Sequence, residues 1–376
     1  MPAPYRPAGA PVETTRQPAL DGLRGVAILL ILAHHWLVWD WPAPLGSMVS
    51  RLQGFLGLSW AGVDLFFVLS GFLIGGILMD QRGSPNYFRT FWLRRFFRIA
   101  PVFVLFLSVY WLGSRVWPVF PPSSAPLAVH AAFLTNFWIA KGNFWDSSYL
   151  SLLWSLAIEE QVYLVLPFVV RFISPRLLAA LAAAQLVVSP LLRVAIFLHR
   201  PSEVQLASHV LMPCRADAFA IGLLIALLVR RPALLETVRR GRALFTATGL
   251  ILAIGLAWLT AFNPGYGTGI MCAAGYSVII AAAGWLLLAA SLPGPVAGFL
   301  SHPLLRMFGR WSYFLYLFHR LAAVLARNLV QGLDLGSFWQ FAAVTLIATV
   351  IALTAAALSF RFFEQPLLAV GRRFVY

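Results

Sequence analysis

The stretch SLAIEEQVY at residues 155–163 places two adjacent carboxylates, Glu159 and Glu160, inside an apolar run from Leu150 to about Val170. About 20 apolar residues are enough for a helix to cross the hydrocarbon core of a bilayer. A charge at mid-bilayer costs about 2.5–3.5 kcal/mol, so an intramembrane acid usually has a partner and a function. The alternative is that both acids only join helices through hydrogen bonds. Adjacent residues point about 100° apart on a helix, so one packing contact does not explain both acids, and we favour a functional role.

The composition of the whole chain also indicates a membrane protein. Hydrophobic residues make up 60% of the 376 residues and charged residues 11%, and the mean hydropathy is +0.81. Apolar runs of 18 or more recur along the chain, with no segment of a second composition. We expect a disordered cytoplasmic tail at residues 1–17, a single membrane domain at 18–366 and a basic cytoplasmic tail at 367–376.

Hydropathy and helix-breaking residues predict an all-α, polytopic bundle of about ten transmembrane helices. The expected spans are 22–40, 57–79, 99–117, 151–170, 177–198, 209–229, 244–262, 270–290, 311–330 and 339–363. Residues 118–150 are the least regular part. Their proline cluster predicts a loop, and residues 128–140 fit a short re-entrant helix.

The distribution of basic residues predicts that both termini are cytoplasmic. With ten spans, the outer loops hold only Arg51, Lys141 and Arg200, whereas every inner segment carries arginine. This is the positive-inside bias of multi-pass membrane proteins. It accounts for the net charge of +15 through contacts with anionic lipid and without nucleic acid, because the charges are spread over many short segments.

Cysteine usage and motif searches exclude several other classes of site. Cys214 and Cys272 fall near outer helix ends, where a disulfide is possible but two buried thiols are the favoured interpretation. The chain has no zinc-ligand spacing, no phosphate-binding loop and no dinucleotide-binding glycine motif. We therefore expect no metal and no permanently bound cofactor.

The first span carries Arg24 and His35, eleven residues apart. That spacing is three helical turns plus about 20°, so both residues share one face, separated by roughly 16 Å along the axis. In the predicted orientation Arg24 lies at the inner end and His35 in the outer half. The alternatives are snorkelling of Arg24 to headgroups and a simple interhelical hydrogen bond for His35.

A second group of intramembrane charges lies at about the depth of His35. Asp64 lies near the outer end of the second span, and an aspartate beside a histidine raises the basicity of the ring and fixes its tautomer. Glu159 also falls in the outer half, and so do Arg193, Arg215 and Asp217. We expect these side chains to form one polar pocket in the outer half of the bundle.

Arg95 and Arg98 form a third group at the inner side. They share a face if the third helix begins early, and arginine forks suit phosphates. The alternative is an anchor that obeys the positive-inside rule.

Taken together, these motifs resemble the membrane acyltransferase 3 family over residues 18–366. The motifs are LDGLRG at 20–25 with His35, VDLFFVLSGF at 63–72, RFFRI at 95–99, SLAIEEQVY at 155–163, RAD at 215–217 with Gly222, SYFLYLFH at 312–319 and FEQP at 363–366. Arg320 departs from the pattern, because a small or apolar residue is commoner after the histidine. The soluble esterase-like domain that some members append is absent from this sequence.

The resemblance implies an integral O-acyltransferase that moves an acyl group, acetyl above all, from cytoplasmic acyl-CoA to a hydroxyl of a saccharide or another envelope or small-molecule acceptor. It also implies a multi-pass protein of the bacterial inner membrane. The proposed catalytic residues are His35, as general base or transient acyl carrier, Glu159, which orients it or binds the acceptor, and Asp64 as second support. The substrate-binding set is Arg24, Arg95, Arg98, Ser155, Glu160, Arg215 and His319. Arg215, Ser70 and Ser155 are unranked candidates for stabilising the oxyanion.

Two other classes fit some of the sequence. A transporter or flippase of lipid-linked sugars also places charges around a cavity, but the chain lacks a matched pair of broken helices in two halves. A non-catalytic sensor or scaffold leaves the His, Glu and Arg set unexplained. The acceptor, the acyl-chain length, the oligomeric state and the existence of an acyl-enzyme intermediate do not follow from the sequence.

Overall fold

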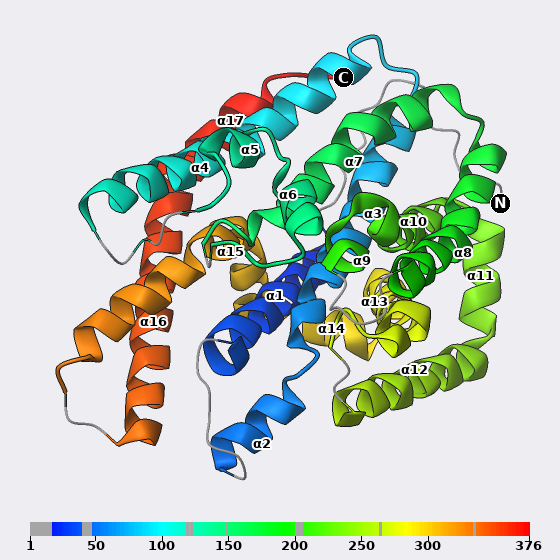
Figure 1. The fold of residues 1–376 in the computed structure, drawn as a ribbon. Helices are drawn as coiled ribbons and strands as arrows, with labels where there is room; N and C mark the ends of the chain where they lie inside the picture. The colour runs from blue at the N-terminus through cyan, green and yellow to red at the C-terminus, as the bar shows by residue number, and fades with distance from the viewer. Residues whose placement is uncertain are drawn as a thin grey trace.

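The computed structural model describes residues 17–39, 47–117, 120, 123–147, 149–199, 206–262, 265–333 and 336–376. Every regular element in these ranges is helical, which confirms the predicted all-α class. Figure 1 shows the helices gathered in one bundle, with α12 and α16 at opposite sides of it. The predicted tail at residues 1–17 lies almost wholly outside the described residues.

The long helices account for the predicted spans. They are α1 (Pro18–Ala33), α3 (Gly62–Asp80), α4 (Tyr87–Val116), α7 (Leu153–Phe172), α8 (Pro175–His199), α10 (Met212–Val229), α12 (Arg242–Phe262), α13 (Tyr276–Ser291), α15 (Pro303–Val330) and α16 (Ser337–Ser359). Four short π or 3-10 segments extend them: η1 (His34–Trp39), η2 (Ser59–Ala61), η3 (Met271–Gly275) and η4 (Phe360–Glu364). Short helices fill the ends: α2 (Met48–Phe55), α5 (Leu127–Ala131), α6 (Thr135–Gly142), α9 (Leu206–Val210), α11 (Pro232–Arg240), α14 (Pro295–Leu300) and α17 (Gln365–Arg372).

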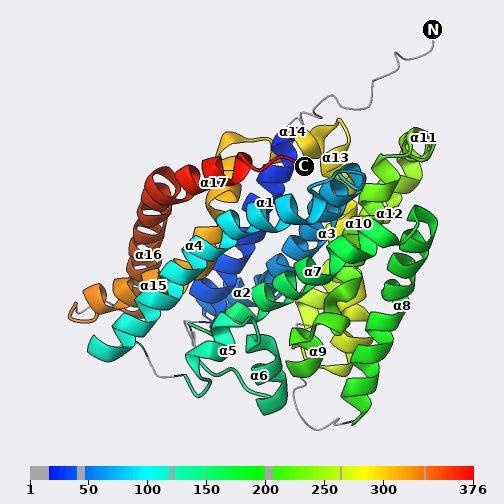
Figure 2. The same ribbon diagram turned by 90° about the horizontal axis from the view of Figure 1, so that it is seen from above.

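Nine helical segments within the described ranges are long and apolar enough to cross a membrane. The predicted span at 311–330 is not among them, because α15 carries Arg306, Arg310, Arg320 and Arg327. This helix is nevertheless 28 residues long, about 42 Å at 1.5 Å per residue. The beginning of α1 and the C-terminus lie at the same end of the bundle in Figure 2, as an even number of crossings would give.

The two ends of the bundle differ in their short helices. Figure 2 shows α11, α14 and α17 at one end and α5, α6 and α9 at the other. We call these the inner and outer ends, following the predicted orientation. Residues 128–140 do not form one re-entrant helix, because α5 and α6 are separated by a break at which Phe133 has a φ of 55°.

The inner C-terminal segment is packed against α4. Arg94 Nε donates to the carbonyl of Phe374 at 2.9 Å, and Thr90 Oγ1 donates to the carbonyl of Val375 at 2.8 Å. The residues predicted as a basic tail therefore end α17 and lie along the helix that carries Arg95 and Arg98.

Close contact between α3 and α10 depends on two glycines. A Cβ on Gly71 would lie 2.1 Å from the carbonyl oxygen of Phe219, and one on Gly222 would lie 2.0 Å from that of Val68. Real Cβ atoms do not approach this closely, so the two backbones touch only because both positions lack side chains. This contact fixes α3, which has Asp64 in its first turn, against α10, which carries Arg215.

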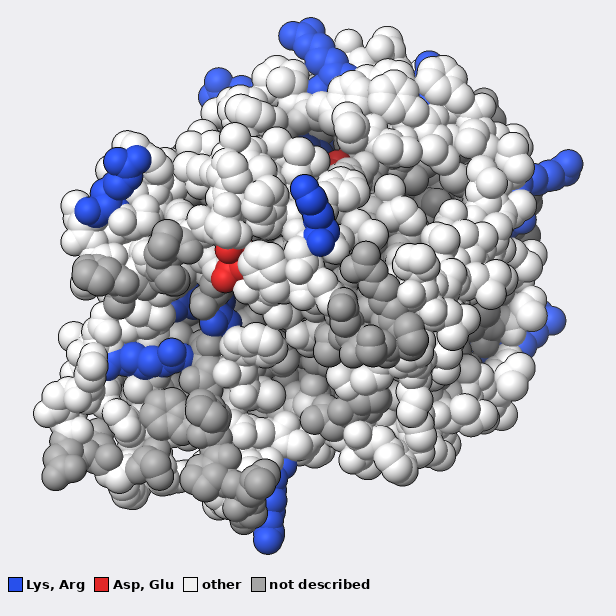
Figure 3. Space-filling model, in the orientation of Figure 1, with Lys and Arg blue, Asp and Glu red and all other residues white. Residues whose placement is uncertain are grey.

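The surface around the sides of the bundle is apolar and sparsely charged. In α12 only Leu259 is buried, and its large aliphatic residues face outward, as expected where lipid is the solvent. Figure 3 shows Lys and Arg side chains scattered singly over the visible face rather than joined in a stripe. This pattern agrees with the expectation that the positive charge serves lipid contacts.

Candidate active site

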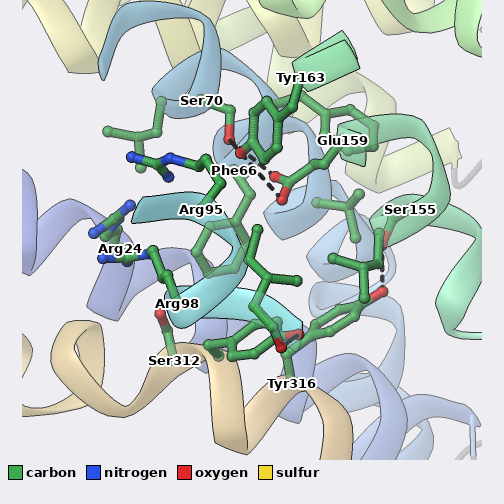
Figure 4. A pocket seen from close by; sticks show the side chains of 16 residues that line it. Arg24, Phe66, Ser70, Arg95, Arg98, Ser155, Glu159, Tyr163, Ser312 and Tyr316 are labelled. Atoms are coloured by element: carbon green, nitrogen blue, oxygen red, sulfur yellow. Dashed lines mark hydrogen bonds between the residues drawn. The ribbon is translucent and has the colours of Figure 1, made fainter. Parts of the chain in front are cut away.

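A polar pocket opens between α1, α3, α4, α7 and α15. It contains about 740 Å³ of empty space, part of it open to the outside. Three arginines line it, Arg24 from α1 and Arg95 and Arg98 from α4. The other lining residues are Val63, Phe66, Phe67, Leu69, Ser70, Ile99, Ser155, Leu156, Glu159, Tyr163, Ser312, Tyr313 and Tyr316. Figure 4 shows the arginines together on one side of this pocket, with Glu159 and the Ser155–Tyr316 pair elsewhere around it.

Arg95 and Arg98 line the pocket together because α4 begins early. This helix starts at Tyr87, so Arg95 and Arg98 lie three residues apart on a regular helix, as the spacing predicts. Arg95 also lies over the rings of Phe91, at 5.9 Å, and Tyr163, at 5.7 Å. Within the described ranges the ion pairs are Arg193–Asp217, Arg215–Asp64, Arg230–Asp80 and Arg240–Glu236, so none of the pocket arginines has a carboxylate partner there.

Glu159 is held by two hydroxyl groups rather than by a histidine. Ser70 Oγ donates to Glu159 Oε1 at 3.0 Å, Tyr163 OH lies 3.4 Å from Oε2, and the two hydroxyls are 2.9 Å apart. The carboxylate thus shares the pocket with the arginines. The structure does not bring Glu159 to His35, so the expectation that it orients this ring is not supported.

A second hydroxyl pair lies at another part of the pocket. Ser155 Oγ and Tyr316 OH are 2.5 Å apart. Tyr316 OH donates to the carbonyl of Leu152 at 2.6 Å, whereas Ser155 Oγ is 3.5 Å from the same carbonyl. Because the tyrosine proton is directed to the backbone, the serine is the donor in the Ser155–Tyr316 bond.

His35 pairs with His319 across the contact between α1 and α15. The ring centroids are 4.8 Å apart, and the His319 ring is 6.3 Å from the ring of Tyr316. His35 Nδ1 lies 3.0 Å from the carbonyl of Ile31, and His319 Nδ1 lies 2.8 Å from that of Tyr316. Carbonyls only accept, so both neutral rings carry their proton on Nδ1. In each ring Nε2 is then the basic nitrogen, and for His319 it is buried with no partner in the described structure.

Asp64 does not support His35, and this part of the prediction is wrong. Asp64 Oδ1 is ion-paired with Arg215 Nη2, and both side chains are buried. Arg193 forms a second pair with Asp217 at 2.7 Å and also donates to the carbonyl of Cys214 at 2.5 Å.

The sequence predicted one outer pocket for all the charged residues at this depth. The structure instead separates the Asp64, Arg193, Arg215 and Asp217 side chains from His35 and Glu159. The depth of a residue in the membrane can be predicted from its position in a span, but the side of the bundle on which its helix lies cannot. In the structure α8 and α10 lie on the far side of α3 from α1 and α15. The two cysteines beside the Arg193 pair are free and buried, as favoured from the sequence.

Glu160 does not line the pocket. Its Oε1 is buried without a partner among the described residues. The neighbouring Gln161 instead bonds to Asn136 of α6.

The described residues hold no group of three or more His, Cys, Asp or Glu side chains that could bind a metal.

Sequence reasoning missed the tyrosines of the site, Tyr163, Tyr313 and Tyr316. Their spacing contained the signal: Ser155, Glu159 and Tyr163 recur every four residues, which places them on one face of α7. The same period relates Ser312 to Tyr316 on α15. The prediction considered only charged residues. The tyrosine and serine hydroxyl groups lie on the same helix faces as those residues and were therefore also predictable.

Comparison with known proteins assigns the chain to a family. Residues 17–357 match the acyltransferase domain model. Peptidoglycan O-acetyltransferase OatA of Listeria monocytogenes is 29% identical over 375 residues, which cover 93% of this chain and 55% of that protein. Putative peptidoglycan O-acetyltransferase YrhL of Bacillus subtilis is 29% identical over 373 residues, with 95% and 55% coverage. No solved structure matches the chain.

The fold and the site define a multi-pass membrane protein in which a cationic pocket adjoins a pair of histidines. The chain belongs to the acyltransferase 3 family. It spans about half the length of the curated relatives that it matches.

Proposed function

We propose that the protein transfers an acetyl group from cytoplasmic acetyl-CoA to a hydroxyl of an envelope saccharide. The observation that carries this proposal is the set of three arginines, Arg24, Arg95 and Arg98, that line one pocket without a carboxylate partner in the described structure. Cations in a low-dielectric environment need an anion nearby. Coenzyme A supplies one, because its nucleotide end carries a pyrophosphate and a further phosphate.

The donor would lie with its phosphates on the arginines and its pantetheine arm along the pocket. The Ser155–Tyr316 pair lines the pocket too, and His319 and His35 follow beyond Tyr316. The positive-inside bias places the arginines towards the cytoplasm. This arrangement would hold the nucleotide at the inner side while the thioester approaches the histidine pair.

His35 would act as the general base. Its Nδ1–H bond to Ile31 leaves Nε2 to accept the proton of the acceptor hydroxyl. The hydroxyl oxygen then forms a bond to the thioester carbon, the carbon–sulfur bond breaks, and the imidazolium returns its proton to the departing thiolate. Acceptor, acetyl group and coenzyme A balance without a further reactant.

Ser155 is the favoured donor to the tetrahedral oxyanion. Ser70 is bonded to Glu159, and Arg215 is paired with Asp64 outside the pocket. Ser155 lines the pocket beside Tyr316, and its proton would turn from Tyr316 OH to the oxyanion during the reaction. A positioned donor of this kind typically contributes about 10²–10³ in rate. Glu159, fixed by Ser70 and Tyr163, would position the arginines and the donor.

The acceptor class rests on the relatives. Two of them are named as peptidoglycan O-acetyltransferases, and a third, 33% identical over 165 residues, is a putative O-acetyltransferase of Staphylococcus aureus. The first two names give peptidoglycan as the acceptor, which falls within the saccharide class that the resemblance noted from the sequence implies.

The proposal is tested with purified protein in nanodiscs and acetyl-labelled acetyl-CoA. We expect hydrolysis or transfer of the label, and His35→Ala should lower turnover by about 10²–10⁴, because a general base contributes that much. Arg240→Gln, a change in an exposed inner pair, is the control. Near-normal turnover by His35→Ala would exclude the base, and binding without turnover by the wild type would favour a transporter.

A further inference from the structure

Six aromatic rings, His209 of α9 among them, gather at the outer end of the bundle. We call them the outer aromatic cluster: Trp60, Trp145, Trp154, His209, Tyr266 and Tyr276. His209 is at their centre, with ring centroids 4.5 Å away for Trp154, 4.8 Å for Tyr266 and 5.5 Å for Trp60. They come from η2, the segment before α7, α7 itself, α9, the segment after α12, and α13, so the fold assembles them from distant parts of the chain.

The cluster adjoins the proposed site of chemistry. Trp154 precedes Ser155, whose hydroxyl bonds to Tyr316. His209 lies within electrostatic range of His34, the neighbour of His35. His34 Nδ1 is buried and has no partner within the described ranges. A molecule bound at the cluster would therefore be close to the histidine pair without entering the arginine pocket.

The cluster also reaches the surface. Trp145 and Tyr266 are half-buried, whereas Trp60, Trp154 and His209 are buried beneath them. Trp145 and Tyr266 both belong to connecting segments at the predicted outer side. Their rings are 5.9 Å apart, and Trp145 Nε1 donates to Tyr266 OH at 2.7 Å.

Polar groups within the cluster are arranged for a neutral ligand. His209 Nδ1 lies 2.7 Å from Tyr276 OH, which donates to the carbonyl of Tyr266 at 2.8 Å. The second nitrogen of His209 is thus the one able to contact a bound molecule. Arg215 lies over the Tyr276 ring at 4.1 Å, and its charge is matched by Asp64. Nothing in the cluster adds an unmatched charge.

We propose that the outer aromatic cluster is the acceptor subsite and binds a neutral saccharide ring. This inference rests on the proposed function. Sugars present flat C–H faces that stack on Trp and Tyr, while ring N–H and O–H groups satisfy their hydroxyls. The cluster has both kinds of group, half-exposed at its rim. The saccharide would enter from the outer side, and the coenzyme would bind from the inner side.

The test separates acceptor from donor. Trp145→Ala and Tyr266→Ala should each raise the apparent KM for soluble peptidoglycan fragments at least tenfold, while acetyl-CoA hydrolysis and its KM stay within twofold of wild type. Trp145→Phe, which keeps the stacking face, should retain most acceptor binding. Trp258→Ala is the matched control, because Trp258 is 45% exposed on lipid-facing α12 and packs on Phe262.

Three outcomes overturn the proposal. The acceptor KM is unchanged in both alanine variants, or donor hydrolysis falls in parallel with transfer, which a purely structural role predicts. Alternatively, the wild type hydrolyses acetyl-CoA yet acetylates no fragment. If the wild type does not turn over acetyl-CoA at all, the proposed function fails instead. Quenching of tryptophan fluorescence by the fragments, lost in Trp145→Ala, then still decides whether the subsite exists.

Discussion

Two groups of arginine lie within the same bundle and differ in burial and in pairing. Arg193 and Arg215 are fully buried and each is paired with an aspartate. Arg24, Arg95 and Arg98 are half-buried around a pocket and have no such partner in the described ranges. The paired group has its countercharge built into the fold. The three arginines of the other group share their pocket with one carboxylate, Glu159, so an anion from outside would balance the excess of positive charge. This excess, rather than the presence of charge, distinguishes a binding site from a structural one.

The largest effect is expected in the paired group. Asp64→Ala or Arg215→Ala leaves an uncompensated buried charge, which costs about 3–5 kcal/mol. We expect loss of folded protein, measured as a lower unfolding temperature and a lower yield in detergent. The double variant Asp64→Leu/Arg215→Met should recover most of that stability. Single variants as stable as wild type would contradict the structural role.

The unpaired group should behave in the opposite way. Arg24→Gln or Arg98→Gln should leave unfolding temperature within a few degrees of wild type and raise the apparent KM for acetyl-CoA. A hydrogen bond to a charged group is worth about 1.5–3 kcal/mol, which corresponds to about 10- to 100-fold. Steady-state kinetics and thermal unfolding on the same preparations measure both. If these variants unfold at a lower temperature while the KM for acetyl-CoA is unchanged, Arg24 and Arg98 are structural, like Arg193 and Arg215.

Lysine substitutions sharpen the distinction between a phosphate clamp and a membrane anchor. Arg95→Lys and Arg98→Lys keep the charge and lose the fork. We expect a KM increase of about tenfold, or about 1.4 kcal/mol, with insertion intact because the positive-inside rule counts both residues. An anchor predicts silent lysine variants and harm only from neutral ones. Kinetics in nanodiscs distinguishes these outcomes.

The smallest effect is expected at the hydroxyl that holds Glu159. Ser70→Ala removes its 3.0 Å bond to the carboxylate while Tyr163 remains. A net loss of about 0.5–1.5 kcal/mol predicts a two- to tenfold decrease in kcat/KM for acetyl-CoA, measured by release of free thiol. Ser114→Ala, whose hydroxyl bonds only to the carbonyl of Trp111 near the end of α4, serves as the comparison. A Ser70→Ala variant indistinguishable from it would remove Ser70 from the site.

Helix period and hydropathy were sufficient for the fold, and the same period brought Arg95 and Arg98 into one pocket. Helix period and hydropathy did not predict on which side of α3 the helix α10 would pack. Asp64 and His35 lie at similar depths, but the glycine contact between Gly71 and Gly222 fixes Asp64 against α10, and no pattern within a single helix shows which helix is its neighbour. Tyr163 and Tyr316 were overlooked because a tyrosine in a span usually indicates packing, whereas here both hydroxyls bond to groups of the site.

The unpaired arginines also bear on how catalysis would end. Under the proposed function they contact the phosphates of coenzyme A, which are identical before and after the acetyl group leaves. Binding energy of that kind holds substrate and product equally and does not lower the barrier between them. Free coenzyme A would then compete for the same pocket, and its departure towards the cytoplasm would limit turnover. The rate of envelope modification would follow the ratio of acetylated to free coenzyme inside the cell.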